Sequence, residues 1–420
     1  MSNRKHLLAL CALVCAVCFT SARQTAAQSA LKAEKVELFK SGEGGYDTYR
    51  IPAIVTTNKG TLLAFCEGRK DHGGDAGDID ILLKRSEDGG ATWSSQQVIW
   101  NDGANTCGNP CPVVDEETGD VFILMTHNLG SDHESDIITG KAKSTRTVWV
   151  AKSSDDGRSW TKPDNITAAA KKKDWGWYAT GPGVGIQIKE GPRKGRLVIP
   201  CDHSYDDPQG NVRGGPYEYG AHVIYSDDHG KTWQLGEPIR PKVNECQVVE
   251  LADGNGTLLM NMRSYFGRAR RTHAISYDGG LTWTDPEDAA ELVEPVCQAS
   301  ILRYSWPDEE KTAVGDEAAG KRSVSRKRTK KVQGSGAAGK SILLFLNPAS
   351  TSKRHNMTLR ASYDEGKTWP VIKTLFTGPS AYSSLGKLPD GAILCLYEAG
   401  IERPYETIIF QKLDPADLLK

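Results

Sequence analysis

The sequence predicts an all-β protein built from one repeated sheet unit. Three observations lead to this prediction: a phrase recurs along the chain, short alternating apolar segments precede it, and Asp-x-Gly turns close it. The phrase fits S-x-D-x-G-x-[TS]-W and occurs as SEDGGATW (86–93), SSDDGRSW (153–160), SDDHGKTW (226–233), SYDGGLTW (276–283) and SYDEGKTW (362–369). Repeats on this scale are typical of solenoids and β-propellers.

The spacing of the phrase favours a six-bladed β-propeller with four antiparallel strands per blade. Successive copies start 67, 73, 50 and 86 residues apart. Removing a 27-residue leader from the 420 residues leaves 393, or about 65 for each of six blades. That length is enough for four short strands and generous loops.

Within each copy, the Asp side chain can accept backbone N–H groups across a turn while the Gly takes a positive φ. The Trp can then pack on the strands below the turn. These residues are expected to shape the fold and to lie away from any chemistry.

Residues 1–27 read as a secretory signal peptide. Arg4 and Lys5 precede an apolar run from Leu7 to Phe19, and Thr25-Ala26-Ala27 forms a small-x-small cleavage pattern before Gln28. We therefore expect a secreted or periplasmic protein whose mature chain, residues 28–420, forms one domain. Cysteines inside the leader leave lipoprotein anchoring as a less favoured alternative.

Composition excludes several classes of function. The formal net charge is −1, so nothing overall favours nucleic acid, and stable membrane insertion is not expected. Seven cysteines remain after the leader, an odd and scattered set; Cys107 and Cys111 could pair, but buried free thiols are the preferred interpretation. Cysteine or histidine clusters at zinc spacing are lacking, so no structural metal is expected.

One segment interrupts the strand pattern. Residues 307–341 are polar, charged and nearly free of large apolar residues, and they lie between the strand-like runs ASILRYS and ILLFLNP. We expect a long disordered loop insertion. Its basic run KRSVSRKRTKK could touch an anionic partner, although a solvated loop is the better interpretation.

Three arginines stand beside apolar strand residues, which is costly unless each meets an anion. They are Arg50 in TYRIPAIV, Arg263 in LLMNMRSYF and Arg354 in SKRHNMTLR. Singly, each is more typical of a structural ion pair or a surface position. Three in different repeat units indicate a shared anion site, since guanidinium groups bind carboxylates in a bidentate manner.

The YRIP motif and the five repeated phrases resemble the exo-α-sialidase (neuraminidase) family, in which the phrases are called Asp boxes. The resemblance covers the chain after the leader, apart from 307–341. It implies a six-bladed propeller that removes terminal sialic acid from glycoproteins, gangliosides and oligosaccharides. It also implies that Arg50, Arg263 and Arg354 hold the substrate carboxylate and that Arg69, in EGRK, lies in the same site.

The family's acid/base aspartate follows the EGR run, where this chain has EGRKDHGGDAGDIDILLKRS. Counting back from the LLKRS strand places Asp75 at the family position. Asp78 is the closest alternative, and Asp71 and Asp80 fit less well.

The family's tyrosine nucleophile matches Tyr382 in PSAYSSLGKL, with Tyr397 in LCLYEAG as the alternative. Tyr397 ends an apolar strand, so a core position suits it better. The partner glutamate resembles Glu245 in VNECQVVE, with Glu250 as the fallback.

A tyrosine nucleophile suits a substrate that carries its carboxylate on the anomeric carbon, because a carboxylate nucleophile would be repelled there. Glu245 would take the phenolic proton and Asp75 would protonate the leaving oxygen, which predicts retention of configuration and requires no cofactor. Trp175, Trp177 and Tyr178 are expected either beside the sugar or in the core.

Two other functions remain open: a trans-sialidase or anhydro-forming enzyme, and a sialic-acid-binding lectin. A lectin should keep the arginines and lose the catalytic tyrosine, glutamate and aspartate. This chain has candidates for all three, which counts against a lectin. We expect a monomer.

Overall fold

The computed structural model describes residues 35–307 and 339–419, and within them it is an all-β protein of antiparallel sheets, as predicted. The predicted leader and almost all of the predicted 307–341 insertion lie outside the described residues. The described helices are short: α1 (Glu134–Ile138), α2 (Thr167–Ala170), and the 3₁₀ turns η1 (Gly191–Arg193), η2 (Val212–Gly214) and η4 (Pro415–Asp417).

The strands of the first half of the chain are β1 (Lys35–Lys40), β2 (Thr48–Thr56), β3 (Leu62–Arg69), β4 (Ile79–Ser86), β5 (Gln97–Trp100), β6 (Thr106–Val114), β7 (Val121–Asn128), β8 (Thr147–Ser153), β9 (Asp164–Asn165), β10 (Tyr178–Thr180), β11 (Ile186–Gln187) and β12 (Leu197–Asp206). Those of the second half are β13 (Tyr217–Ser226), β14 (Gln234–Leu235), β15 (Val243–Glu250), β16 (Leu258–Ser264), β17 (Arg270–Ser276), β18 (Glu287–Val293), β19 (Ser300–Ser305), β20 (Ile342–Pro348), β21 (His355–Ser362), β22 (Val371–Lys387), β23 (Ile393–Ala399) and β24 (Thr407–Leu413).

Strand pairing divides the chain into successive antiparallel groups. β2 to β5 form one group and β6 to β9 the next; a single parallel pair, Ile79 with Thr106, joins them. β12 pairs with β10, β11 and β13, β13 pairs with β14, and β15 to β18 form a separate sheet. β22 serves two groups, because Val371–Pro379 pairs with β21 while Ser380–Lys387 pairs with β23.

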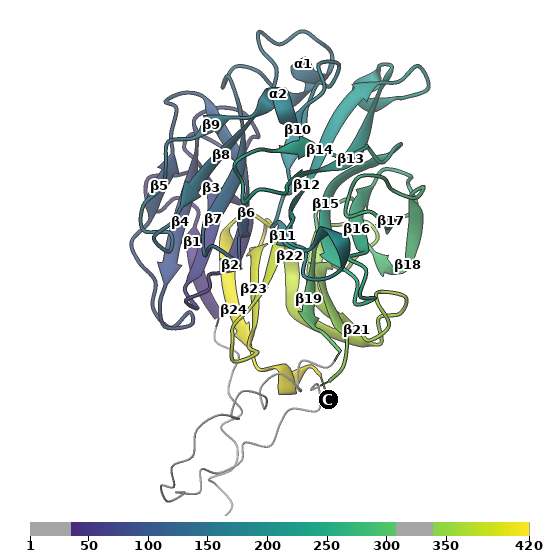
Figure 1. Ribbon diagram of the computed structural model, residues 1–420. Helices are drawn as coiled ribbons and strands as arrows, with labels where there is room; N and C mark the ends of the chain where they lie inside the picture. The colour runs from purple at the N-terminus through teal and green to yellow at the C-terminus, as the bar shows by residue number, and fades with distance from the viewer. Residues whose placement is uncertain (1–34, 308–338, 420) are drawn as a thin grey trace, which may run out of the picture. The chain divides into compact units, whose positions relative to one another are not determined.

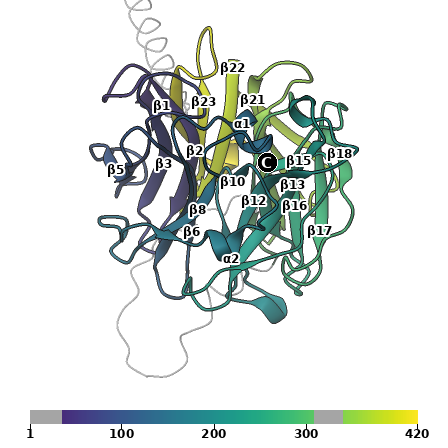
Figure 2. The same cartoon turned by 90° about the horizontal axis from the view of Figure 1, so that it is seen from above.

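The groups follow one another in a closed ring. Contacts connect β2 with β6, β6 with β10, β12 with β15, β15 with β19, β19 with β22, and β22 with β2. The ring is closed a second time by β1, which pairs with β24 from the other end of the chain (Figure 1). Seen from above, the sheets surround a central region over which α1 lies (Figure 2).

The apolar cores lie between neighbouring groups, because each sheet must bury both faces. Ala64 and Leu82 pack with Leu394 and Phe410, which joins the first group to the last. Comparable clusters fill the next four interfaces around the ring. Inner strands are therefore buried along nearly their whole length, as β2 is.

The Asp boxes form the predicted turns. In the first copy, Asp88 Oδ1 accepts the Thr92 N–H at 2.9 Å and Oδ2 accepts the Thr92 hydroxyl at 2.6 Å, while Ser86 Oγ accepts the Gly90 N–H. Equivalent Asp bonds recur in the other four copies. None of the box residues lines the large cavity described below.

Each box needs two consecutive residues with positive φ, where the sequence indicated only its Gly. The residue before the Gly also has a positive φ: Gly89, Asp156, His229, Gly279 and Glu365 have values of 69°, 68°, 58°, 72° and 61°. The predicted packing of the Trp is confirmed. The ring contacts are Trp93–Phe410, Trp160–Phe65, Trp233–Phe122 and Trp369–Phe345.

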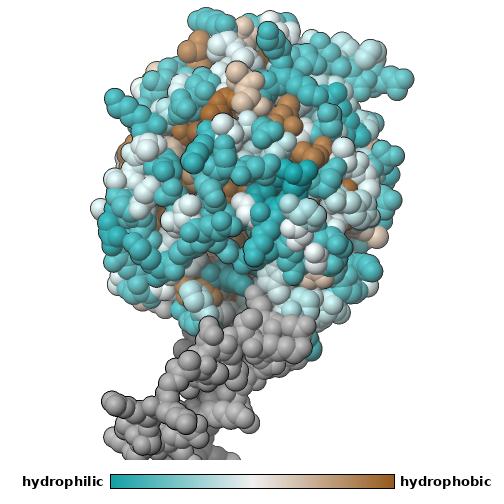
Figure 3. Space-filling model, viewed as in Figure 1, coloured by the Kyte–Doolittle hydropathy of each residue, from teal (hydrophilic) through white to brown (hydrophobic). Residues whose placement is uncertain are grey.

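Polar side chains cover most of the face seen in Figure 3, and apolar ones occur there in small scattered groups. In the described ranges, no helix has the length and apolar character needed to cross a membrane. Cys107 and Cys111 are buried free thiols, as preferred from the sequence.

Candidate active site

The ring of sheets contains a polar cavity of about 830 Å³. All seven site residues proposed from the sequence line it. These residues are Arg50, Arg69, Asp75, Glu245, Arg263, Arg354 and Tyr382. They come from β2, β3, the β3–β4 loop, β15, β16, the residue before β21, and β22. Residues up to 332 positions apart in the sequence therefore share one cavity.

β-Bulges turn the side chains of the inner strands into the cavity. The strand register shifts between Arg50 and Ala53, between Val243 and Cys246 around Glu245, and between Ser380 and Ser383 around Tyr382. A bulge bends its strand and re-aims the extra side chain. In β2 the bulge places Ile51 at a φ of 59°, a left-handed conformation that is unfavourable for a β-branched residue.

Tyr382, Glu245 and Arg263 form a compact triad. The Tyr382 hydroxyl donates a hydrogen bond to Glu245 Oε1, and Arg263 Nη1 contacts Glu245 Oε2 at 2.7 Å and the Tyr382 oxygen at 3.3 Å. Burial and the Glu245 charge raise the pKa of Tyr382, against the opposing effect of nearby arginines. The phenol is therefore neutral at rest and has its proton acceptor already in contact.

The guanidinium groups of Arg50 and Arg354 lie 5.0 and 5.5 Å from the centre of the Tyr382 ring. Arg354 donates to the Tyr405 hydroxyl at 2.8 Å and to the Val296 carbonyl at 3.2 Å. It has no carboxylate partner among the described residues, so its positive charge is available to an anion from solution.

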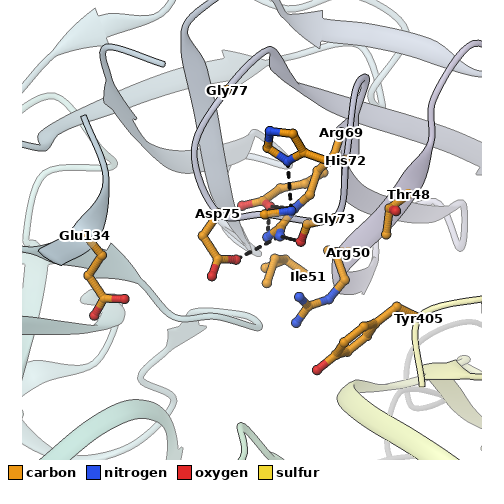
Figure 4. A network of polar contacts seen from close by, with 12 residues as sticks. Thr48, Arg50, Ile51, Arg69, His72, Gly73, Asp75, Gly77, Glu134 and Tyr405 are labelled. Carbon is orange, nitrogen blue, oxygen red and sulfur yellow. Dashed lines mark hydrogen bonds and ion pairs between the residues drawn. The ribbon is translucent and has the colours of Figure 1, made fainter. Parts of the chain in front are cut away.

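Asp75 reaches the cavity from the β3–β4 loop. Its Oδ1 lies 2.8 Å from Arg69 Nη1, and Arg69 also donates to the Gly73 carbonyl at 2.7 Å. The Asp75 side chain is 64% exposed, and in Figure 4 it points toward the open space that Glu134 and Arg50 also face. Partial burial disfavours its charge, but Arg69 and Arg50 outweigh this and lower the pKa of Asp75 to about 2.

The alternative aspartates lie elsewhere. Asp78 pairs with Lys70 at 3.0 Å, and Asp80 accepts the Tyr46 hydroxyl at 2.6 Å. Asp71 is exposed, and none of the three lines the cavity. Asp75 is thus the aspartate of this loop that faces the other site residues.

The alternative tyrosine and glutamate are also separate from the site. Tyr397 is fully buried and donates to Gln411 Oε1 at 2.9 Å, so its predicted core position is confirmed. Glu250 accepts the backbone N–H groups of Lys189 and Glu190 and lines a different cavity.

The three aromatic residues considered from the sequence divide between site and core. Trp177 lines the cavity, with the Arg146 guanidinium 4.1 Å from its ring centre. Trp175 stacks on His203 at 3.6 Å, and the Tyr178 hydroxyl contacts His222 at 3.0 Å, both inside the core.

Sequence reasoning missed Glu398, a buried carboxylate beneath the site. Its Oε1 accepts Arg50 Nε–H at 2.7 Å and the Ile51 N–H at 2.9 Å, and its Oε2 accepts the Tyr382 N–H at 3.0 Å. A charged residue at the end of the apolar run ILCLY was the available signal. Glu398 fixes both an arginine and the tyrosine, and it satisfies the N–H that the β2 bulge frees.

Two further carboxylates were also missed. Glu67 accepts two bonds from Arg69, at 2.9 and 2.6 Å, and so fixes the arginine that holds Asp75. Asp202 lies on β12 and lines the cavity.

The known proteins that this chain is similar to belong to one family. Residues 60–395 match the BNR repeat-like domain family. A sialidase from Micromonospora viridifaciens is 33% identical over 87% of this chain and 52% of its own length, so this chain spans about half of that relative. Sialidase-3 of Mus musculus is 30% identical over 89% of this chain and 92% of its own length.

Among solved structures, the Hadza microbial sialidase Hz136 superimposes with a TM-score of 0.72 at 29% identity. The superposition covers 91% of this chain and 68% of that structure. The chain therefore belongs to the sialidase family.

Proposed function

We propose that this protein is an exo-α-sialidase that hydrolyses terminal α-linked sialic acids on glycoproteins, gangliosides and oligosaccharides. The hydrogen bond from Tyr382 to Glu245, inside a cavity that three arginines also line, is the observation that carries the proposal. Family membership supports the same reaction.

The substrate carboxylate is proposed to bind Arg50, Arg263 and Arg354. Guanidinium groups suit a planar carboxylate because they donate two parallel hydrogen bonds. Arg50 and Arg354 stand around the ring of Tyr382, so a carboxylate held by them brings the anomeric carbon next to the phenolic oxygen.

In the first step, Tyr382 Oη attacks the anomeric carbon, Glu245 takes the phenolic proton, and the glycosidic C–O bond breaks. Asp75 gives a proton to the leaving oxygen. In the second step, Asp75 takes a proton from water, whose oxygen displaces Tyr382, and Glu245 returns the phenolic proton. Two displacements at one carbon retain its configuration.

Asp75 can donate a proton only if its pKa rises above the value of about 2 that it has in the free protein. Substrate binding supplies a reason for this rise. The incoming carboxylate offsets the charge of Arg50, and the glycan displaces water from the exposed face of Asp75.

We also propose that the ring is a six-bladed propeller. β22 and the β4–β6 junction each join two groups, and dividing the sheets there gives four strands per blade. The blades are β2–β5, β6–β9, β10 with β12–β14, β15–β18, β19–β21 with the first half of β22, and the second half of β22 with β23, β24 and β1.

Release of 4-methylumbelliferone from its α-N-acetylneuraminide tests the activity. Tyr382→Phe should lower kcat by at least about a hundredfold, because it removes the nucleophile. Tyr397→Phe is the matched control: it removes a hydroxyl bonded to Gln411 away from the cavity and should keep kcat within about twofold. Equal losses in the two variants would contradict the assignment of Tyr382.

Asp75→Ala should retain part of its activity on the aryl substrate, whose leaving group needs little protonation, and lose far more on sialyllactose. Asp78→Ala, which removes only the pair with Lys70, is the control on the same loop and should affect both substrates alike. If Asp75→Ala lost the same fraction of its activity on both substrates, Asp75 would be excluded as the general acid.

The covalent step has its own test. A 2,3-difluorinated sialic acid should increase the mass of the peptide that contains Tyr382, and Tyr382→Phe should not be labelled. NMR of the first product should show the α-anomer of free sialic acid. A 2,7-anhydro product or a sialylated acceptor would show that the enzyme catalyses a transfer reaction instead of hydrolysis. Binding of a sialoside without turnover would indicate a lectin.

We further propose that residues 1–27 direct export and that the mature protein is a secreted or periplasmic monomer. N-terminal sequencing should give Gln28 as the first residue, and light scattering should give the mass of one chain.

A further inference from the structure

Asp202 is a buried carboxyl group in the cavity that the proposed reaction does not use. It lies on β12, is only 1% exposed, and lines the cavity. Its Oδ1 accepts the Asn244 side-chain N–H at 3.2 Å. Its Oδ2 is buried and lacks a hydrogen-bond partner among the described residues. A buried oxygen without a partner is costly, so such a group in a ligand cavity points to a partner supplied by the ligand.

The groups around Asp202 favour its protonated form. Burial raises its pKa well above the usual range, and the nearby carboxylates of Glu245 and Glu134 raise it further. Arg263 and Arg146 act in the opposite direction without reversing the shift. A protonated carboxyl has an O–H to donate, which an ionised one lacks.

The neighbouring strand directs Asn244 and Glu245 to the same cavity. Side chains of consecutive strand residues normally point to opposite faces, but β15 has a register shift between Val243 and Cys246. Both residues therefore line the cavity. Asn244 donates to Asp202 Oδ1 and leaves Oδ2 as the oxygen that can carry the proton.

We propose that Asp202 is a substrate-binding residue whose carboxylic acid donates a hydrogen bond from Oδ2 to an uncharged oxygen of the bound sugar. The inference rests on the proposed sialidase function. A neutral acid suits this position because an ionised one would repel an anionic substrate and add a second charge beside Glu245.

Two substitutions test the proposal on the full-length protein. Asp202→Leu removes the donor at similar volume and should raise KM for the aryl sialoside about three- to tenfold, with kcat within about twofold. Asp202→Asn keeps a donor of the same size, so its KM should rise less than that of the leucine variant. Thr272→Val is the control, because the Thr272 hydroxyl is also buried and has no partner in the part of the chain that the structure describes, but it lies outside the cavity, and KM should not change.

Binding of N-acetylneuraminic acid, measured by calorimetry on the same variants, gives a readout that does not require turnover. An inactive wild type would refute the proposed function, while the ranking of affinities would still decide the role of Asp202. Equal affinities in wild type and Asp202→Leu would overturn the proposed role of Asp202. An equal loss of affinity in Asp202→Asn and Asp202→Leu would overturn it as well.

Infrared spectroscopy tests the protonation directly and does not depend on a folded leucine variant. The difference spectrum between wild type and Asp202→Asn at neutral pH should contain the C=O band of a carboxylic acid, and this band should shift when N-acetylneuraminic acid binds. Carboxylate bands in its place would refute the proposal.

Discussion

Glu398→Gln should destabilise the protein and damage the site together. The native carboxylate accepts three N–H donors, from Arg50, Ile51 and Tyr382, and its side chain is fully buried. A glutamine amide has a single oxygen, so whichever way it turns, its NH₂ group faces at least one of these donors. The substitution also leaves the Arg50 guanidinium buried without its counter-charge.

The expected loss is about 3–5 kcal/mol in the free energy of unfolding, the usual cost of removing one partner from a buried ion pair. The Arg50–Glu398 distance of 2.7 Å and the side-chain exposures of 7% and 0% place the pair in that class rather than among surface pairs. KM should rise and kcat should fall, because Glu398 fixes both a carboxylate-binding arginine and the tyrosine.

Urea unfolding followed by tryptophan fluorescence gives the stability, and the aryl sialoside assay gives the kinetics. Glu402→Gln makes the same chemical change on an exposed side chain four residues away, and its unfolding free energy should change by less than about 0.5 kcal/mol. A Glu398→Gln protein as stable as this control, with wild-type KM, would refute the reasoning.

Arg354→Ala should raise KM and lower kcat together, and unchanged kinetics would remove Arg354 from the proposed carboxylate site. Hydrogen bonds from Ser159 lower the pKa of Asp155 to about 2. The stability that Asp155 contributes is therefore present above about pH 4 and is lost as the pH falls toward 2. In urea unfolding, the unfolding free energy of Asp155→Asn should depend less on pH in this range than that of the wild type. Burial holds the pKa values of His203 and His222 well below the usual range. The unfolded state therefore binds more protons below about pH 6.5, and wild-type stability should decline there more steeply than that of a His203→Gln/His222→Gln variant.

The repeat turns could be predicted from sequence because all their contacts are local. Asp88, Ser86 and Thr92 meet within one phrase, so the phrase itself specifies the turn. The second positive φ escaped prediction because His229 and Glu365 give no such signal, and the turn imposes that conformation on them.

Residues that line the cavity were predictable where a motif distinguishes one residue from its neighbours, as for Arg50 and Tyr382. Glu398 and Asp202 could not be assigned in this way. Their roles depend on partners brought together by the ring: Glu398 meets Arg50 across 348 positions, and Asp202 meets Asn244 across 42. Neither residue type nor spacing reveals such a meeting in advance.

Closure of the ring by β1 and β24 sets the order in which the protein can be completed during synthesis. Lys35 is made long before Gln411, its partner in the sheet. The ribosome must therefore release β24 before β1 has a strand to pair with. The contact between β2 and β22, which brings Arg50 close to Tyr382, also lies between the first and the last group of strands. The nascent chain thus carries β1 without its partner strand until residues 407–413 have been made, and the contacts between β2 and β22 at the site await the synthesis of β22.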